Sequence, residues 1–103
     1  MFGEDFANST PDTLRNRIYG IQKASKIPML IAVDEEGGTV VRASRYRQFR
    51  STSYASPRAV FSAGGWNGIV KDTKNKAKFL KKLGINTNLA PVADVAYDSS
   101  NFI

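Results

Sequence analysis

The chain has 103 residues, of which 42% are hydrophobic and 23% charged, so it has the length of one small domain and lies outside the compositional class of disordered proteins. It contains no cysteine and no histidine, which excludes disulfides, thiolate metal sites and histidine-based catalysis by these residues alone. Its formal charge of +6 would suit an acidic partner such as nucleic acid.

A first helix is predicted over residues 11–25. Pro11 suits the first helical position, and Ser9 or Thr10 can accept a hydrogen bond as the N-terminal cap. The apolar residues that follow recur at i, i+4 and i+7, which places them on one face of a helix. These residues are Leu14, Ile18 and Ile21.

The run MLIAV at 29–33 is apolar without polar alternation, which is typical of a short strand buried on both faces of a parallel sheet. A long connection from 35 to 65 follows, and connections of this length are often functional. Within it, TVVRAS at 39–44 could form a short strand, and Ser56-Pro57 could begin a helical turn.

A second helix is predicted from Trp66 to about residue 83, because one face repeats at spacings of three and four and Gly84 stands where a left-handed C-terminal cap belongs. The lysines beside this face are expected to face solvent. The face consists of Trp66, Ile69, Val70, Thr73, Ala77 and Leu80, and the lysines are Lys71, Lys74, Lys76, Lys78, Lys81 and Lys82. A strand at 85–90 follows, and Pro91 limits its extension.

This order of elements predicts an α/β fold with parallel strands alternating with helices. Each predicted strand is followed by acidic residues: Asp34, Glu35 and Glu36 follow the first strand, and Asp94 follows the second. In α/β folds ligands bind at the edge formed by the carboxyl ends of the strands. The acidic residues are therefore candidates for a binding site.

Three interpretations of these acids remain open. They could cap a turn or face water beside the Gly37-Gly38 pair. They could hold a divalent cation through Asp34, Glu36 and Asp94, although the spacing matches no calcium loop and no metal site is predicted. They could bind a sugar, because a carboxylate accepts strong hydrogen bonds from adjacent hydroxyls.

The basic residues do not indicate nucleic-acid binding, and no such partner is predicted. Four arginines lie in the connection after the first strand, interleaved with Tyr46 and Phe49, but no nucleic-acid-binding motif accompanies them. These arginines are Arg42, Arg45, Arg47 and Arg50. No apolar run approaches the roughly 20 residues of a membrane span, so no membrane span is expected, and the compartment stays undecided.

The segments VDEEGGTVVR and LGINTNLAPVADV resemble two motifs of glycoside hydrolase family 3, and within it the bacterial β-N-acetylhexosaminidase branch. That branch carries a VDQEGGRVQR-like segment and a GINxNxAPVxDV-like segment in the same order and at about this separation. The resemblance implies a retaining glycosidase that removes terminal β-N-acetylglucosamine from glycans or cell-wall fragments and needs no cofactor.

The resemblance also implies roles for individual residues. Asp34 matches the aspartate that grips sugar hydroxyls in the −1 subsite, and Arg42 matches an arginine of the same subsite. Supporting roles are implied for Glu36, Gly37, Gly38 and Asp94, with Glu36 bracing the turn that the two glycines permit. Glu35 is expected to face water. Thr39 and Val41 depart from the family pattern, which leaves room for different contacts.

The family's catalytic domain is a (β/α)8 TIM barrel, which needs about 250 residues. Residues 1–103 are therefore expected to form one incomplete domain, the N-terminal portion of such a barrel. The acid/base histidine with its aspartate, and the nucleophilic aspartate, would lie outside this chain. No catalytic residue is assigned here, and the chain alone is expected to be inactive.

Two alternatives remain beside the hexosaminidase: a non-catalytic α/β carbohydrate-binding or assembly module, and a β-glucosidase-type member of the family. An incomplete barrel would also expose unpaired backbone groups at its sheet edges. Self-association through those edges is therefore expected.

Overall fold

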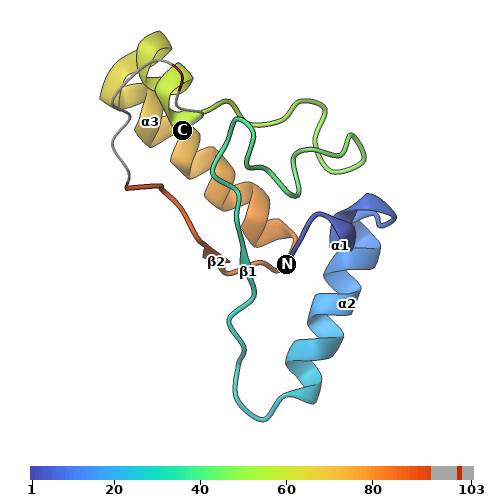
Figure 1. Ribbon diagram of the computed structural model, residues 1–103. Coiled ribbons are helices and arrows are strands. Elements are labelled where there is room, and N and C mark those ends of the chain that lie inside the picture. Colours follow the sequence, from blue (N-terminus) through green and yellow to red (C-terminus); the bar gives the residue numbers. More distant parts are fainter. Residues whose placement is uncertain (94–99, 101–103) are drawn as a thin grey trace.

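Helices and two short parallel strands alternate along the chain in the computed structural model, which describes residues 1–93 and residue 100. The elements are α1 (Glu4–Ala7), α2 (Pro11–Ala24), β1 (Ala32–Val33), α3 (Pro57–Lys82) and β2 (Thr87–Asn88) (Figure 1). β1 pairs with β2 in parallel, with Ala32 opposite Thr87 and Val33 opposite Asn88. The predicted α/β fold with parallel strands is confirmed.

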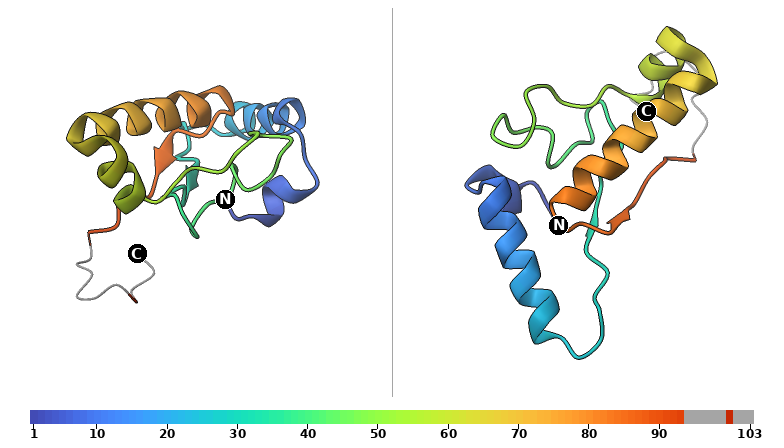
Figure 2. Two further views of the ribbon diagram at one scale, coloured as in Figure 1. Left: turned by 90° about the horizontal axis from the view of Figure 1, so that it is seen from above. Right: turned by 180° about the vertical axis from the view of Figure 1, so that it is seen from behind.

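Helix α2 begins as its capping signal predicts. The Thr10 hydroxyl accepts a hydrogen bond from the Thr13 N–H (3.2 Å), and Pro11 occupies the first turn. Leu14 and Ile18 are buried, but Ile21 is 42% exposed, so the predicted stripe is buried only over its first two positions. Figures 1 and 2 show why: the C-terminal half of α2 projects away from α3 and the strands.

Strand β1 is shorter than the predicted strand at 29–33, and the prediction that it is buried on both faces is wrong before Val33. Leu30 is 80% exposed, because within the described residues only β2 pairs with this run. Side-chain amides, rather than another strand, bond the backbone of residues 29–31. Gln22 exchanges two hydrogen bonds with the Met29 backbone (2.8 and 2.9 Å), and the Asn86 Oδ1 accepts one from the Ile31 N–H (2.8 Å).

Helix α3 begins at Pro57, nine residues before the predicted start at Trp66. The Ser56 hydroxyl caps it by accepting from the Ala59 N–H (3.2 Å). A kink at Gly65 (φ 60°, ψ −152°) then interrupts the helix, so the predicted start coincides with this kink. The C-terminus matches the prediction, because Gly84 has φ +91° and the Ile85 N–H bonds the Leu80 carbonyl (3.1 Å).

The buried face of α3 differs from the predicted one. Trp66 is 74% exposed and packs edge-on against Phe61 across the kink, with ring centroids 5.0 Å apart. Val70 is also exposed, whereas Lys76 is only 8% exposed. Lys76 lies four residues before Leu80, on the face that Leu80 buries. The expectation that all the α3 lysines face solvent is therefore wrong at this position.

The core lies between the helices and the strands. Figure 2 shows α2 and α3 on one face of the strand pair. The buried cluster joins residues of all three helices, β1, the connection and the turn after α3: Phe6, Leu14, Ile18, Val33, Ala43, Leu80, Leu83 and Ile85. In the described part of the chain, no helix combines the length and the apolar character that crossing a membrane requires.

Candidate functional site

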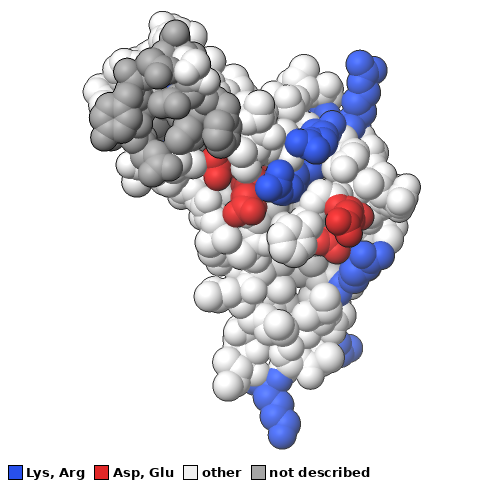
Figure 3. Space-filling model, viewed as in Figure 1, with Lys and Arg blue, Asp and Glu red and all other residues white. Residues whose placement is uncertain are grey.

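Asp34 and Arg42 lie together at the carboxyl end of β1. Asp34 directly follows Val33, and one of its carboxylate oxygens lies 3.9 Å from an Arg42 guanidinium nitrogen. Both side chains are partly open, at 33% and 27% exposed respectively. The opposite charges attract each other at this distance. Because 3.9 Å is too long for a hydrogen bond, both groups can still form hydrogen bonds with a ligand. Figure 3 shows acidic and basic side chains side by side on this face.

Glu35 does not face water, which corrects the prediction for this residue. It is fully buried, and its carboxylate accepts three backbone hydrogen bonds. Oε1 accepts from the N–H groups of Arg42 (2.8 Å) and Ala43 (2.9 Å), and Oε2 accepts from the N–H of Ser44 (3.1 Å). Successive backbone N–H groups that converge in this way form an anion-binding nest. Here the anion is the protein's own carboxylate.

Asn88 extends the pairing of the two strands beyond β1. Its Oδ1 accepts from the Glu35 N–H (2.9 Å), and its Nδ2 donates to the Glu35 carbonyl (3.1 Å). The side-chain amide thus takes the place of another paired strand residue, and it fixes the backbone immediately after Asp34. Sequence reasoning did not single out Asn88. Asparagine is disfavoured within strands, so its presence in the predicted strand was an available signal.

The glycine pair forms a tight turn. Gly37 and Gly38 have φ values of +110° and +65°, and the backbones of Gly37 and Val40 pair in an isolated antiparallel bridge. A Cβ at Gly37 would lie 2.2 Å from the Ala55 carbonyl oxygen, so no side chain fits there. The possible strand at 39–44 is absent, because the N–H groups of 42–44 bond the Glu35 carboxylate instead.

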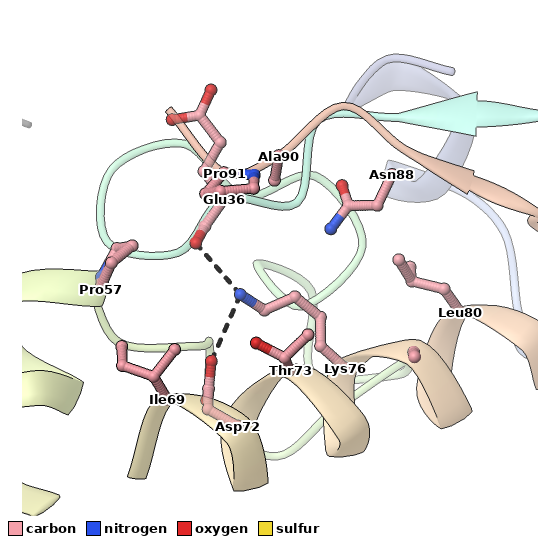
Figure 4. A pocket seen from close by; sticks show the side chains of 11 residues that line it. Glu36, Pro57, Ile69, Asp72, Thr73, Lys76, Leu80, Asn88, Ala90 and Pro91 are labelled. Carbon is pink, nitrogen blue, oxygen red and sulfur yellow. Dashed lines mark hydrogen bonds and ion pairs between the residues drawn. The ribbon is translucent and has the colours of Figure 1, made fainter. Parts of the chain in front are cut away.

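Lys76 connects α3 to this turn, as Figure 4 shows. Its ammonium donates to the Glu36 carbonyl (3.1 Å), pairs with the Asp72 carboxylate (3.4 Å) and lies 5.2 Å from the centre of the Tyr54 ring. The Glu36 carboxylate points away from Lys76 (Figure 4), so Glu36 braces the turn through its main chain. Both residues line a cavity with a volume of about 230 Å³.

We expect Lys76→Met to lower the free energy of unfolding by about 2 kcal/mol. Methionine can fill the volume of the lysine stem, but it leaves the partly buried Asp72 carboxylate and the Glu36 carbonyl without their donor. Lys78→Met, at an exposed position of the same helix, is the matched control and should change stability by less than about 0.5 kcal/mol. Urea unfolding followed by circular dichroism measures both changes. Equal effects would contradict the conclusion that Lys76 stabilises the chain through Glu36 and Asp72.

Tyr54, near the C-terminal end of the connection, bonds back to the glycine turn and to Ser44. Its N–H donates to the Ser44 hydroxyl (3.2 Å), and its carbonyl accepts from the Gly38 N–H (2.9 Å). Burial raises the pKa of the Tyr54 phenol, and its hydroxyl donates to the Asn75 Oδ1 (2.8 Å). The Arg50 guanidinium stacks over the ring at 3.9 Å. Hydrogen bonds therefore hold the segment 34–54 in a defined conformation, despite its irregular backbone.

Among the predicted site residues, the structure places Asp34, Glu36, Gly37, Gly38 and Arg42 in one region. Asp94, the remaining predicted supporting residue, lies outside the described residues. Within residues 1–93 and residue 100, no group of three acidic side chains is arranged to hold a metal ion.

The residues that sequence reasoning missed are Glu35, Asn88 and Lys76. Lys76 could have been found, because Ile69, Thr73, Lys76 and Leu80 recur at helical spacing on the face that lines the cavity. For Glu35 the available signal was weaker. The small residues Ala43 and Ser44 come just after Arg42, and small side chains leave backbone N–H groups accessible to an acceptor.

Comparison with known proteins gives two curated relatives and one family match. Residues 2–103 match the model of the glycosyl hydrolase family 3 N terminal domain. The chain is 36% identical to a beta-hexosaminidase A of Pseudoalteromonas piscicida, over 98% of this chain and 17% of that protein. It is 32% identical to an uncharacterized secreted glycosyl hydrolase of Arthroderma benhamiae, over 93% of this chain and 27% of that protein. No solved structure matches the chain.

Proposed function

Because the chain belongs to glycosyl hydrolase family 3, we propose that it forms the N-terminal part of a (β/α)8 catalytic barrel and supplies part of that barrel's sugar site. The chain spans 17% and 27% of the lengths of the two relatives. A larger catalytic domain around these residues agrees with the alternation of helices and parallel strands, which is the unit from which such barrels are built.

The observation that carries the proposal is the Asp34–Arg42 pair at the carboxyl end of β1. Active sites of (β/α)8 barrels lie at this end of the strands. An aspartate at this place can accept hydrogen bonds from two neighbouring sugar hydroxyls, and an arginine can donate to the same ring. Asp34 and Arg42 would thus hold the sugar of the −1 subsite.

These residues bind the substrate and do not perform its chemistry. In retaining hydrolysis a nucleophile attacks the anomeric carbon, and a second group protonates the leaving oxygen and later activates water. No residue of this chain is assigned to either role. Asp34 and Arg42 orient the ring for that attack, which converts binding energy into positioning. The chain by itself is therefore proposed to be inactive.

We propose terminal β-N-acetylglucosamine as the sugar, because the Pseudoalteromonas piscicida relative is a beta-hexosaminidase. The test is to assay the full-length protein with nitrophenyl β-N-acetylglucosaminide and nitrophenyl β-glucoside, and to assay residues 1–103 in parallel. Faster turnover of the N-acetylglucosaminide by the full-length protein supports the proposal. Faster turnover of the glucoside would replace it with the β-glucosidase alternative, and no turnover of either would favour a non-catalytic module.

Residues 1–103 alone are also proposed to self-associate. Ile27, Leu30 and Leu89 are 60–80% exposed, and in the described part of the chain β2 has no strand beside its outer edge. Exposed apolar side chains beside an open edge favour pairing between copies. Light scattering of this polypeptide at increasing concentration should give a rising average mass, and a constant monomer mass would contradict this part of the proposal.

A further inference from the structure

The Glu35 carboxylate is a buried charged group that the proposed sugar site does not use directly. It has no exposed surface, and its carboxylate accepts hydrogen bonds from the backbone N–H groups of residues 42–44. Burying a carboxylate is unfavourable unless hydrogen bonds compensate for the lost hydration. Three charge-assisted bonds provide that compensation.

These bonds determine where the chain returns after the glycine turn. Glu35 directly follows Asp34, and its Oε1 accepts from the N–H of Arg42. The carboxylate therefore closes the loop between residues 35 and 42. The guanidinium of the same Arg42 lies 3.9 Å from the Asp34 carboxylate. The hydrogen bond that Glu35 accepts from the Arg42 backbone therefore also determines where the Arg42 side chain lies relative to Asp34.

We infer that Glu35 is a positioning residue whose buried carboxylate holds the backbone of residues 42–44 so that Arg42 lies beside Asp34. Glu35 touches no substrate in this arrangement and acts through Arg42. The inference rests on the proposed function for its consequence in catalysis, whereas its structural part concerns only contacts within this chain.

Two substitutions distinguish the anchor from a general packing role. Glu35→Gln keeps the shape of the side chain but retains only one carbonyl oxygen. That oxygen can still accept from Arg42 and Ala43 at the Oε1 position, whereas the amide nitrogen then faces the Ser44 N–H and cannot accept from it. Glu35→Ala removes all three acceptor contacts. Glu4→Gln, in an exposed first turn of α1, is the matched control for loss of one glutamate charge.

The first measurement is amide hydrogen exchange of the full-length protein, read at single-residue resolution by mass spectrometry with electron-transfer fragmentation. Glu35→Gln is expected to speed exchange at Ser44 by about tenfold and to leave Arg42 and Ala43 within about threefold of the unmodified chain. Glu35→Ala should speed all three, and Glu4→Gln none. Equal acceleration of the three amides in Glu35→Gln, or no acceleration in either Glu35 variant, would overturn the inference.

The second measurement is a double-mutant cycle on kcat/KM of the full-length protein with an N-acetylglucosaminide. If Glu35 acts through Arg42, Glu35→Ala, which removes all three backbone contacts, lowers kcat/KM by about threefold to tenfold in the unmodified protein and has little further effect once Arg42 is alanine. Purely structural damage would instead lower kcat/KM by the same factor in both backgrounds, and that result would overturn the inference.

The two measurements separate failure of this inference from failure of the proposed function. If Arg42→Ala leaves kcat/KM unchanged, the proposed sugar site is wrong, and the exchange pattern alone decides whether Glu35 holds residues 42–44. Selective acceleration at Ser44 in Glu35→Gln then still supports the anchor. Uniform exchange across the three amides overturns it.

Discussion

Asp34→Ala in the full-length protein is expected to lower kcat/KM for an N-acetylglucosaminide by about 10²-fold to 10⁴-fold. Two hydrogen bonds between hydroxyls and a carboxylate contribute about 1.5–3 kcal/mol each, and removing Asp34 removes both. The loss should exceed the effect of Glu35→Ala, because Asp34 would contact the sugar and Glu35 would not. Steady-state kinetics with the nitrophenyl substrate measures the change.

Two matched variants define the specificity of this result. Asp34→Asn keeps one acceptor oxygen and should fall between the unmodified protein and Asp34→Ala. Asp12→Ala removes a carboxylate that is 85% exposed and pairs with Arg15 at 3.1 Å on the surface of α2, and it should leave kcat/KM unchanged, since exposed pairs contribute little. An Asp34→Ala protein with unchanged kcat/KM would show that Asp34 does not hold the sugar.

Gly37→Ala is expected to lower the free energy of unfolding of this chain by about 2–4 kcal/mol. Gly37 has φ +110°, which side-chain-bearing residues rarely adopt, and an alanine Cβ would lie 2.2 Å from the Ala55 carbonyl oxygen. The backbone of either the turn or residue 55 must therefore move. Because the turn carries Glu36 and is tied to Lys76, the displacement should also disturb the contacts of Lys76.

The matched control is Gly20→Ala in the middle of α2. Apart from the chain neighbours and the nearby backbone of α2, no atom lies within 4 Å of the position that this Cβ would take, and Gly20 has an ordinary helical backbone. The substitution should raise the free energy of unfolding by about 0.5–1 kcal/mol, because alanine favours helix over the unfolded chain. Urea unfolding of the two variants should therefore give changes of opposite sign. A Gly37→Ala protein as stable as the unmodified chain would contradict the observed turn geometry.

Two helix boundaries could be predicted from this sequence because their signals are local: Thr10 and Pro11 mark the start of α2, and Gly84 follows the end of α3. The predicted start of α3 is nine residues too late, because Ser56 and Pro57 begin the helix itself rather than only a helical turn. The carboxyl edge of the strands could also be predicted, since an apolar run ends directly at Asp34. These features depend on neighbouring residues only.

Burial of charged groups could not be predicted in the same way, because it depends on residues distant in sequence. Glu35 is buried only because the glycine turn brings the N–H groups of 42–44 back to it. Lys76 is buried because the Glu36 carbonyl, 40 residues earlier, accepts a hydrogen bond from its ammonium. The length of the strand at 29–33 was overestimated for a related reason. An apolar run shows that residues can pair in a sheet, but in the described part of the chain only Ala32 and Val33 pair with β2.

The most direct test of the proposed sugar site is a crystal structure of the full-length protein with N-acetylglucosamine bound. We predict that the Asp34 carboxylate accepts hydrogen bonds of about 2.5–3.0 Å from two ring hydroxyls, with the Arg42 guanidinium beside the same ring and the Glu35 carboxylate still bonded to residues 42–44. A sugar bound in the active site with Asp34 and Arg42 both facing solvent would contradict the proposal.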